Sequence, residues 1–452
     1  MELKGKKVMV YGAAKSGISA AGMLQKLGAK VIIFDRNTNL TKEVLKDRYP
    51  FKDDFTLITG ELQEDSLEQV ELLIISPGVP TDHPDIIRVK EKNIPVWSEI
   101  ELAYRYTKGK IIGITGTNGK TTTTTLVGEI MKAFHEEVYV VGNIGNSYSD
   151  AALLTTEQSV TVIELSSFQL ETIHELKPDV SAILNITPDH LDRHYTMENY
   201  ITMKERITLN QSTSEICILN YEDETLREMA KRIPSRIMYF SSERTLQNGL
   251  YLEGDNIICA IQGEPQIFCN INELHLLGKH NYENVMAALG MALSLNIPLD
   301  VIRKAVLNFK GVEHRIEFVE TVKGVTYYND SKGTNPDASI RAVQAMRCPT
   351  VLIGGGYDKK IPFDDLIKAF DGKIKALVLL GQTREQFADT ARKYGFTNII
   401  FADSLKEAVE VSADQALEGD AVLLSPACAS WGMFDNYEQR GRLFKQYVRE
   451  MI

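Results

Sequence analysis

The sequence lacks the features that mark nucleic-acid-binding, membrane and zinc proteins. It has no block of lysine or arginine, and 61 acidic against 50 basic residues give a net charge of −11, which argues against a nucleic-acid or anionic-membrane surface. The five cysteines form no C-x-x-C pair and no zinc-ligand spacing, so we expect packing residues in a reducing cytosol. The first apolar run, VMVY, spans about four residues, too few for a signal peptide or a membrane span. We therefore expect a cytoplasmic protein.

Length and composition are those of an ordinary multidomain globular protein. The sequence is 44% hydrophobic and 25% charged, as soluble domains usually are. Its 452 residues exceed what one hydrophobic core serves, so we expect two to four domains of roughly 100–200 residues each. No internal repeat of roughly 20–50 residues is visible, and the five threonines at 121–125 are the one low-complexity segment.

Short apolar runs alternate with amphipathic segments in three blocks. The first block begins at KKVMVYG and predicts a βαβ unit whose second strand ends at Asp35. The second runs from KGKIIGITGTNGK through SVTVIELSS and DVSAILNITPDH to the helical NYENVMAALGMALSLNI, with β-hairpins predicted over 236–277 around EGDN. The third block begins near Val312 and returns to the α/β pattern. In open parallel sheets, ligands bind where the chain leaves the carboxyl ends of strands, so the loops there are candidate sites.

The segment GITGTNGKTT predicts a phosphate-binding loop. A strand at 110–113 leads through residues 115–121 into a helix, so backbone N–H groups and the helix N-terminus favour an anion. Lys120 can add a charge to a β/γ-phosphate, and the Thr121 hydroxyl can bind Mg²⁺. The first glycine of the strict G-x-x-x-x-G-K-[ST] spacing is replaced by Ile114. The competing interpretation is a glycine-rich turn that only caps a helix.

Two later strand ends offer ligands for a metal nucleotide. Glu164 ends the run VTVIE, where an acidic Mg²⁺ ligand follows the strand next to a phosphate loop. His190 follows the next run, and its imidazole could bind metal or phosphate or be simply solvated. Lys204 lies in a predicted helix, and local spacing does not distinguish it from a solvent-facing lysine.

The N-terminal turn suggests a second nucleotide site. The turn from Gly12 to Gly17 matches G-x-G-x-x-G except that Ala14 replaces the glycine that lets backbone approach a pyrophosphate, and Asp35 stands where a ribose-binding acid would. A dinucleotide site, a nucleotide-sugar site in the same crevice and a Rossmann-like fold without any dinucleotide all remain open.

Several motifs in order carry a family resemblance over essentially the whole chain. They are TGTNGKTT, ELSSFQLE, NITPDHLDRH, GKHNYENVMAA, EHRIE, NDSKGTNPDA, GGGYDKK and SPACASWGMFDNYEQRG. Together they resemble the Mur ligases. NDSKGTN resembles the D-glutamate-adding member, and the D-N-P-R signature of the enzyme that adds the third residue is absent.

The resemblance implies ATP-driven amide formation. The γ-phosphate would pass to the terminal carboxylate of UDP-N-acetylmuramoyl-L-alanine, and the amine of D-glutamate would attack the acyl phosphate, releasing ADP and phosphate. Such a transfer needs mainly positioning and charge neutralisation. The expected cofactors are ATP and two Mg²⁺ ions, which Mn²⁺ could replace, and the expected assembly is a monomer.

The resemblance also assigns site residues. The catalytic set is Lys120, Glu164, His190 and Lys204. One Mg²⁺ falls to Thr121 and Glu164, and the second to His190 and a carbamylated Lys204. ATP-binding residues are Gly116, Thr117, Asn118, Gly119, Lys120, Thr121, Thr122, Asn281, Asn284, Arg315 and Asp330. His314, beside Arg315, receives no role.

Two further sets hold the other substrates. The D-glutamate carboxylates fall to Lys332, Thr334, Lys359, Ser430 and Tyr437. The UDP substrate falls to Lys15, Ser16, Asp35, Arg36, Gly78 and Asn143. This chain departs from the family pattern with Tyr437 where Phe is common, Gly333 where Ala is common, and Lys-Ser after the first turn, which leaves the uracil contacts least defined.

The resulting prediction is a three-domain α/β ligase. Rossmann-like N-terminal (1–98) and C-terminal (312–452) domains flank a P-loop ATPase-type central domain (99–311). We expect catalysis to require closure of the third domain about a hinge near Gly311. Three alternatives stay open: a related ligase with another amino acid, such as a folylpolyglutamate synthetase; a nicotinamide oxidoreductase acting through the first domain; and a catalytically inactive, nucleotide-gated interaction protein.

Overall fold

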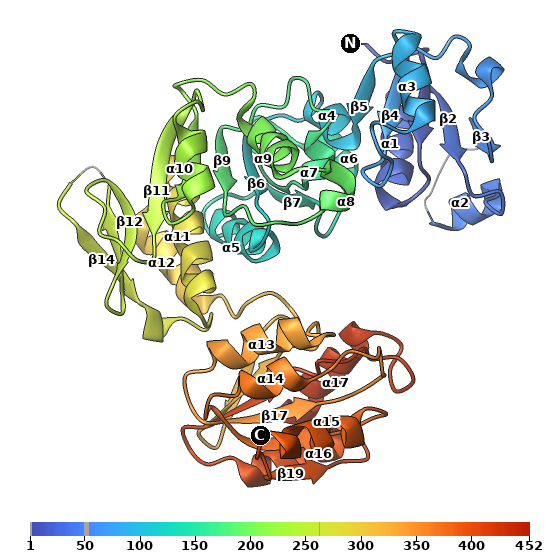
Figure 1. The fold of residues 1–452 in the computed structure, drawn as a ribbon. Coiled ribbons are helices and arrows are strands. Elements are labelled where there is room, and N and C mark those ends of the chain that lie inside the picture. Colours follow the sequence, from blue (N-terminus) through green and yellow to red (C-terminus); the bar gives the residue numbers. More distant parts are fainter. Residues whose placement is uncertain (1, 49–53, 262) are drawn as a thin grey trace. The chain divides into compact units, whose positions relative to one another are not determined.

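The computed structural model describes residues 2–48, 54–261 and 263–452. Residues 1–268 with 283–305 form one compact unit, and residues 269–282 with 306–452 form a second. Figure 1 colours the chain from blue at the N-terminus to red at the C-terminus, so that each of the three sheets can be followed separately. Within the described ranges, no helix has both the length and the apolar character that crossing a membrane requires.

The first sheet has five parallel strands in the order β3-β2-β1-β4-β5. Successive residues of a strand point to opposite faces, and here Val8 and Val10 belong to one apolar core while Met9 and Tyr11 belong to another. The strand order reverses between β1 and β4, so the loops after these strands border the crevice where such sheets bind ligands. The elements are β1 (Lys7–Tyr11), α1 (Lys15–Lys26), β2 (Lys30–Asp35), α2 (Lys42–Arg48), β3 (Phe55–Thr59), β4 (Leu72–Ile75), α3 (Pro84–Glu91), β5 (Val96–Ser98) and α4 (Glu99–Tyr104).

The second sheet has nine strands in the order β14-β13-β12-β11-β10-β9-β6-β8-β7. The phosphate-loop strand β6 lies between β8 and β9, and its Ile114 pairs with Glu164 of β8. Its strands are β6 (Lys110–Thr115), β7 (Val138–Gly142), β8 (Val160–Glu164), β9 (Val180–Ile183), β10 (Ile216–Asn220), β11 (Arg236–Ser241), β12 (Gly249–Glu253), β13 (Asn256–Ala260) and β14 (Gln266–Asn270). Its helices are α5 (Lys120–Lys132), α6 (Tyr148–Ala151), α7 (Ser167–Leu170), α8 (Leu191–His194), α9 (Met197–Glu205), α10 (Glu224–Ala230), α11 (Lys279–Ser294) and α12 (Leu299–Asn308).

The third sheet has six strands in the order β15-β16-β20-β17-β18-β19. Only β15 is antiparallel among the pairs recorded for this sheet in the described residues, and alternate residues such as Leu352 and Ile353 again face two different cores. The elements are β15 (Glu317–Val322), β16 (Val325–Asn329), α13 (Pro336–Ala345), β17 (Thr350–Gly354), α14 (Asp364–Lys368), β18 (Ile374–Leu379), α15 (Arg384–Lys393), β19 (Ile399–Phe401), α16 (Leu405–Gln415), β20 (Ala421–Leu424) and α17 (Tyr437–Arg449).

Most predicted elements are present, and two pairings differ from the prediction. The hairpin at EGDN is confirmed, since β12 and β13 pair antiparallel with Glu253 opposite Asn256. A hairpin between β11 and β12 is wrong, because these strands run parallel; apolar alternation identifies a strand but not its direction. The antiparallel β15 was not predicted, although Lys323 and Gly324 both have positive φ, as a tight hairpin turn requires.

Candidate functional site

The predicted phosphate loop lies between β6 and α5. Ile114, at the missing glycine, is a buried strand residue, so the turn itself runs from Gly116 to Gly119. Both glycines have positive φ, 147° and 83°. A Cβ at Gly119 would also collide with the Asn284 side-chain oxygen, which places Asn284 directly against the loop. Only glycine fits this position without strain.

The segment that follows β9 braces the loop. The Asn185 side chain accepts a hydrogen bond from Asn118 N at 2.8 Å and donates to Asn118 O at 3.1 Å. Thr117 Oγ1 donates to Thr187 O at 3.1 Å, and the Thr117 amide donates to Asn185 O. Sequence reasoning did not single out Asn185, although it lies in the quoted NITPDH motif. These bonds hold the backbone of the loop in place.

Two ammonium groups converge on one carbonyl oxygen. Lys120 Nζ donates to Gly116 O at 2.8 Å and to Thr117 O at 2.8 Å. Lys204 Nζ also donates to Gly116 O at 2.8 Å. Two cations so close repel each other unless one is neutral or an anion lies beside them. The arrangement therefore suits an anionic ligand.

Lys204 is buried, which its local sequence did not indicate. It lies on α9, 2% of the residue is exposed, and its ammonium group is 4.7 Å from the centre of the Tyr200 ring. Burial, with a smaller contribution from the charge of Lys120, lowers the pKa of Lys204 to about 7. Removing an ammonium group from water favours its neutral form. A neutral amine can react as a nucleophile.

Glu164 has the environment expected of a cation ligand. It is 2% exposed at the end of β8, and its Oε1 accepts a hydrogen bond from Asn143 Nδ2 at 3.0 Å. Oε2 has no hydrogen-bond partner among the described residues. A buried carboxylate oxygen without a donor is costly unless a cation satisfies it. The carboxylate therefore fits the Mg²⁺ assigned to it.

His190 precedes α8 in a left-handed backbone conformation, with φ 52° and ψ 33°. Half of its side chain is exposed, and its ring centre lies 4.9 Å from that of Phe168. No group of three or more His, Cys, Asp or Glu side chains able to hold a metal occurs in the described part of the chain. The ligand set predicted from the resemblance also includes Thr121 and Lys204, which are not residues of these four types. Carbamylation of Lys204 stays a prediction.

A cavity of about 370 Å³ brings several predicted residues together. Gly78, Lys120, Asn143, His190 and Lys204, assigned above to the UDP substrate, phosphate and metal, all line it. The remaining lining residues are Pro77, Ser166, Ser167, Phe168, Asp189 and Tyr200. This volume falls within the range of small-molecule sites. Sequence reasoning named none of these six as ligands.

Two threonines of the run at 121–125 form specific side-chain hydrogen bonds. Thr123 and Thr124 are buried, and Thr123 Oγ1 donates to Asn284 Oδ1 at 3.2 Å. Thr125 Oγ1 donates to Thr121 O at 2.8 Å. Thr123 therefore fixes one of the predicted adenosine-binding side chains to the start of α5.

In the first sheet, Asp35 holds the turn rather than projecting freely. Its two oxygens accept hydrogen bonds from Ala13 N at 2.7 Å and Asn37 N at 2.8 Å. Arg36 Nη1 lies 2.7 Å from His83 Nε2, and Lys15 Nζ donates to Gly145 O at 2.5 Å. Ser16 is the second residue of α1, in the segment that follows β1.

In the second unit, Asp330 is buried, with 6% of the residue exposed. Its carboxylate accepts hydrogen bonds from Ser425 Oγ at 2.7 Å and Ile316 N at 3.3 Å, and burial raises its pKa to about 7. Arg315 is exposed on the preceding turn. Asn281, also in this unit, donates from its buried amide to Leu277 O at 2.7 Å.

The residues predicted for D-glutamate gather at the carboxyl end of the third sheet. Lys359 Nζ lies 3.4 Å from Thr334 O, and Lys332 Nζ lies 5.5 Å from the centre of the Tyr437 ring. Ser430 is buried in the loop after β20.

Arg440, missed by sequence reasoning, connects two of these loops. Its guanidinium donates to Ser331 O at 2.8 Å, Ser331 Oγ at 3.0 Å and Cys428 O at 3.2 Å. Burial lowers its pKa to about 10. The sequence around Arg440 does not indicate that its side chain is buried.

Comparisons with known proteins match the whole chain. Residues 114–292 match the family described as Mur ligase middle domain, residues 314–428 the Mur ligase glutamate ligase domain, and residues 6–98 the Mur ligase MurD-like N-terminal domain. The UDP-N-acetylmuramoylalanine–D-glutamate ligase of Lachnoclostridium phytofermentans is 55% identical over 451 residues, 100% of this chain and 99% of the relative. The enzyme of that name from Clostridioides difficile is 46% identical over 100% of both chains.

Solved structures share the fold at low identity. The UDP-N-acetylmuramate-alanine ligase of Thermotoga maritima has a TM-score of 0.58 at 18% identity, covering 99% of this chain and 100% of that one. The UDP-N-acetylmuramoylalanyl-D-glutamyl-2,6-diaminopimelate–D-alanyl-D-alanyl ligase of Acinetobacter baumannii has a TM-score of 0.56 at 16% identity, covering 94% and 86%. The predicted three-domain α/β fold is thereby confirmed.

Proposed function

The chain belongs to the Mur ligase family, and we propose that it adds D-glutamate to UDP-N-acetylmuramoyl-L-alanine in peptidoglycan precursor synthesis, using ATP. The family performs ATP-dependent ligation, and the two full-length relatives described above are named D-glutamate ligases. One observation from the site carries the proposal: the ammonium groups of Lys120 and Lys204 meet at Gly116 O, beside a cavity lined by Gly78 and His190.

The proposed chemistry proceeds in two steps. The γ-phosphoryl group moves from ATP to a carboxylate oxygen of the alanyl residue, forming an acyl phosphate, and ADP leaves with the electron pair of the broken P–O bond. The D-glutamate amine then attacks the carbonyl carbon, phosphate leaves with the electron pair of the broken C–O bond, and the amine gives up a proton to form the amide. Lys120 neutralises phosphate charge, while the braced loop and the Asn143 side chain hold the reacting groups in position.

Mg²⁺ would supply further charge neutralisation on the phosphates. We assign Glu164 and Thr121 to one ion, since the free Glu164 Oε2 offers an oxygen ligand. We assign His190 and a carbamylated Lys204 to a second ion. The neutral Lys204 amine would add to carbon dioxide and lose a proton, giving a carbamate with two oxygen ligands; its pKa near 7 favours this step.

The substrate sets divide between the two compact units. UDP-substrate residues (Lys15, Ser16, Asp35, Arg36, Gly78, Asn143) lie in the first unit, and D-glutamate residues (Lys332, Thr334, Lys359, Ser430, Tyr437) lie in the second. We propose domains at 1–98, 99–311 and 312–452 for the UDP substrate, ATP and the amino acid. We also propose that the protein is cytoplasmic, because ATP and UDP-linked precursors are cytoplasmic and all five cysteines are free. The monomer expected from the family resemblance stays a proposal.

A panel of amino acids tests the proposal. Phosphate release is measured with ATP, Mg²⁺ and UDP-N-acetylmuramoyl-L-alanine, adding D-glutamate, L-glutamate, L-lysine or diaminopimelate in turn. We expect D-glutamate to give the fastest release, and omission of the UDP substrate to abolish it. Faster release with any other amino acid of the panel would contradict the proposal.

A further inference from the structure

The turn that carries Arg315 has a strained backbone. His314 and Ile316, on either side of Arg315, both have left-handed φ values of 67° and 43°. Such values are uncommon outside glycine, and a β-branched isoleucine is a clear outlier. Strained residues persist only where their surroundings hold them, and they cluster at functional sites. Side chains of α17, β15 and β16 hold this turn.

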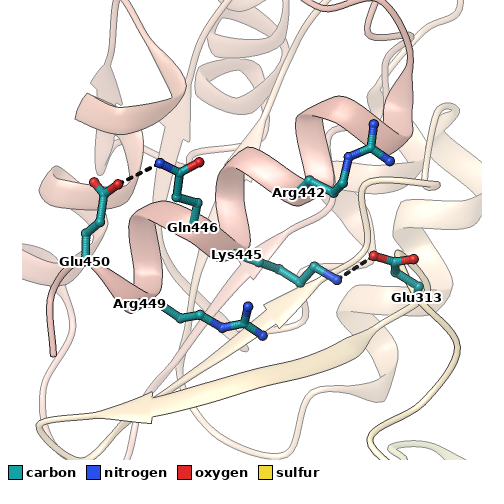
Figure 2. A pocket seen from close by; sticks show the side chains of 6 residues that line it. All are labelled: Glu313, Arg442, Lys445, Gln446, Arg449 and Glu450. Atoms are coloured by element: carbon teal, nitrogen blue, oxygen red, sulfur yellow. Dashed lines mark hydrogen bonds and ion pairs between the residues drawn. The ribbon is translucent and has the colours of Figure 1, made fainter.

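Lys445 of α17 clamps both ends of the turn. Its ammonium group donates to Glu313 Oε1 at 2.7 Å and to Glu317 Oε1 at 2.9 Å. The Lys445 side chain is 13% exposed and that of Glu317 14%, so this ion pair is largely shielded from water, whereas the Glu313 side chain is 57% exposed. A shielded pair between charged groups is held more firmly than a surface pair. Figure 2 shows the Lys445–Glu313 pair within a groove along α17.

Glu317 connects Lys445 to His314 through hydrogen bonds. Its Oε2 accepts hydrogen bonds from His314 N at 3.0 Å and Asn329 Nδ2 at 2.9 Å. Asn329 Nδ2 also lies 2.9 Å from His314 Nδ1. A Cβ at Gly441 of α17 would collide with the His314 ring, so the helix packs directly on the turn. The strained residue is thus fixed through its amide and its ring.

The same turn touches the neighbouring predicted ligands. Ile316 N donates to Asp330 Oδ1 at 3.3 Å, and His314 O accepts a hydrogen bond from Lys332 N at 3.0 Å. A shift of the turn would therefore move Arg315 and disturb the hydrogen bond to Asp330. The side chains of two arginines of the same groove, Arg442 and Arg449, have no hydrogen bond or ion pair among the described residues, whereas the Lys445 side chain has two.

We propose that Lys445 is a positioning residue that, through Glu313 and Glu317, holds the strained turn so that Arg315 can bind the nucleotide. The inference rests on the proposed function, which assigns Arg315 to ATP. Lys445 acts at a distance from the nucleotide and lies outside every residue set assigned above to a substrate.

Steady-state kinetics of Lys445→Met test the proposal. We expect the KM for ATP to rise by about tenfold or more, while the KM for the UDP substrate stays unchanged, since its residues lie in the first unit. Lys445→Arg should restore most of the affinity, because it keeps the charge. Arg449→Met is the matched control, an exposed cation of the same helix and groove, and should behave as wild type. A KM for ATP within about twofold of wild type in Lys445→Met would overturn the proposal.

A second variant guards against misfolding of the first. Glu313→Gln removes one partner of Lys445 and leaves the Glu317 bonds in place. We expect a smaller rise in the KM for ATP, and a double variant no worse than Lys445→Met alone, because both changes act on one interaction. Additive effects would overturn the proposal.

Direct binding separates this inference from the proposed function. The affinity of each folded variant for a non-hydrolysable ATP analogue is measured by titration calorimetry. If the wild-type protein shows no ligase activity, the proposed function is refuted. Weaker binding of the analogue by Lys445→Met than by wild type would still support the role of Lys445. Equal analogue binding by wild type and Lys445→Met would overturn that role.

Discussion

Single residues around Gly116 decide the electrostatics of the site. Lys120 is placed by its position after Gly119, at the first turn of α5, where the helix N-terminus and the ammonium group would both attract an anion. Lys204 reaches the same carbonyl oxygen from α9. Lys120 therefore belongs to the loop motif itself, whereas Lys204 comes from a segment far away in the sequence.

Lys120→Ala should abolish most of the phosphate release. Loss of a preorganised charge on a transferring phosphoryl group lowers kcat by roughly 10²–10³. The matched control is Lys132→Ala, at the other end of the same helix, where the ammonium group pairs with Glu129 on the surface. Phosphate release is measured for both variants at saturating substrates. Full turnover by Lys120→Ala would refute the catalytic role assigned to it.

At the scale of elements, a buried carboxyl joins α4 to α7. Glu99 begins α4, is 2% exposed, and its Oε1 accepts a hydrogen bond from Gln169 Nε2 at 2.8 Å. Gln169 in turn forms a capping box with Ser166, which lines the candidate cavity. Glu99 Oε2 has no hydrogen-bond partner among the described residues. Burial raises the pKa of Glu99 to about 7.

The free energy of unfolding should decrease as pH rises, because of Glu99. Its folded pKa lies above its unfolded value, so its stabilising contribution is complete below the unfolded pKa and is lost as pH rises through about 7. One proton changes the free energy of unfolding by up to about 1.4 kcal/mol per pH unit. Between about pH 5.5 and about pH 7.5, wild type should therefore lose about 2 kcal/mol more than Glu99→Gln.

Urea unfolding at the two pH values measures this difference. Glu157→Gln, which removes an exposed carboxyl, is the control and should follow wild type. Parallel pH dependence of wild type and Glu99→Gln would contradict the predicted titration.

For the whole molecule, the assigned substrates divide between the two compact units. The UDP-substrate residues follow β1, β2, β4 and β7 in the first unit, whereas the D-glutamate residues follow β16, β17 and β20 in the second. Each set lies at the carboxyl ends of parallel strands, as expected for open α/β sheets. Binding of one substrate should therefore change amide exchange in one unit only.

Hydrogen exchange can map this division. UDP-N-acetylmuramoyl-L-alanine should slow amide exchange in residues 12–17 and 76–83, and D-glutamate should slow it in residues 330–335 and 355–360, because bound ligands suppress local opening. L-glutamate at the same concentration is the control. Protection of the second unit's loops by the UDP substrate, with none in the first unit, would contradict the assignment.

Much of the architecture could be read from local patterns. Period-two and period-3.6 apolar spacing located β6, β8 and α11 because each element buries its own side chains. The same patterns did not give strand direction, so the parallel pairing of β11 with β12 was missed. Direction depends on where the connecting segment leads the chain, and residues 242–248 carry no periodic signal of it.

By itself, the sequence determined the phosphate loop, the strand-end position of Glu164 and the family, because these depend on contiguous residues in a fixed order. Only the tertiary structure decided that Lys204 is buried against Gly116, that Asn185 braces the loop, and that Lys445 clamps the turn of Arg315. Those contacts join residues far apart in the chain. Their burial and pKa shifts arise from packing, which no local pattern of residue types specifies.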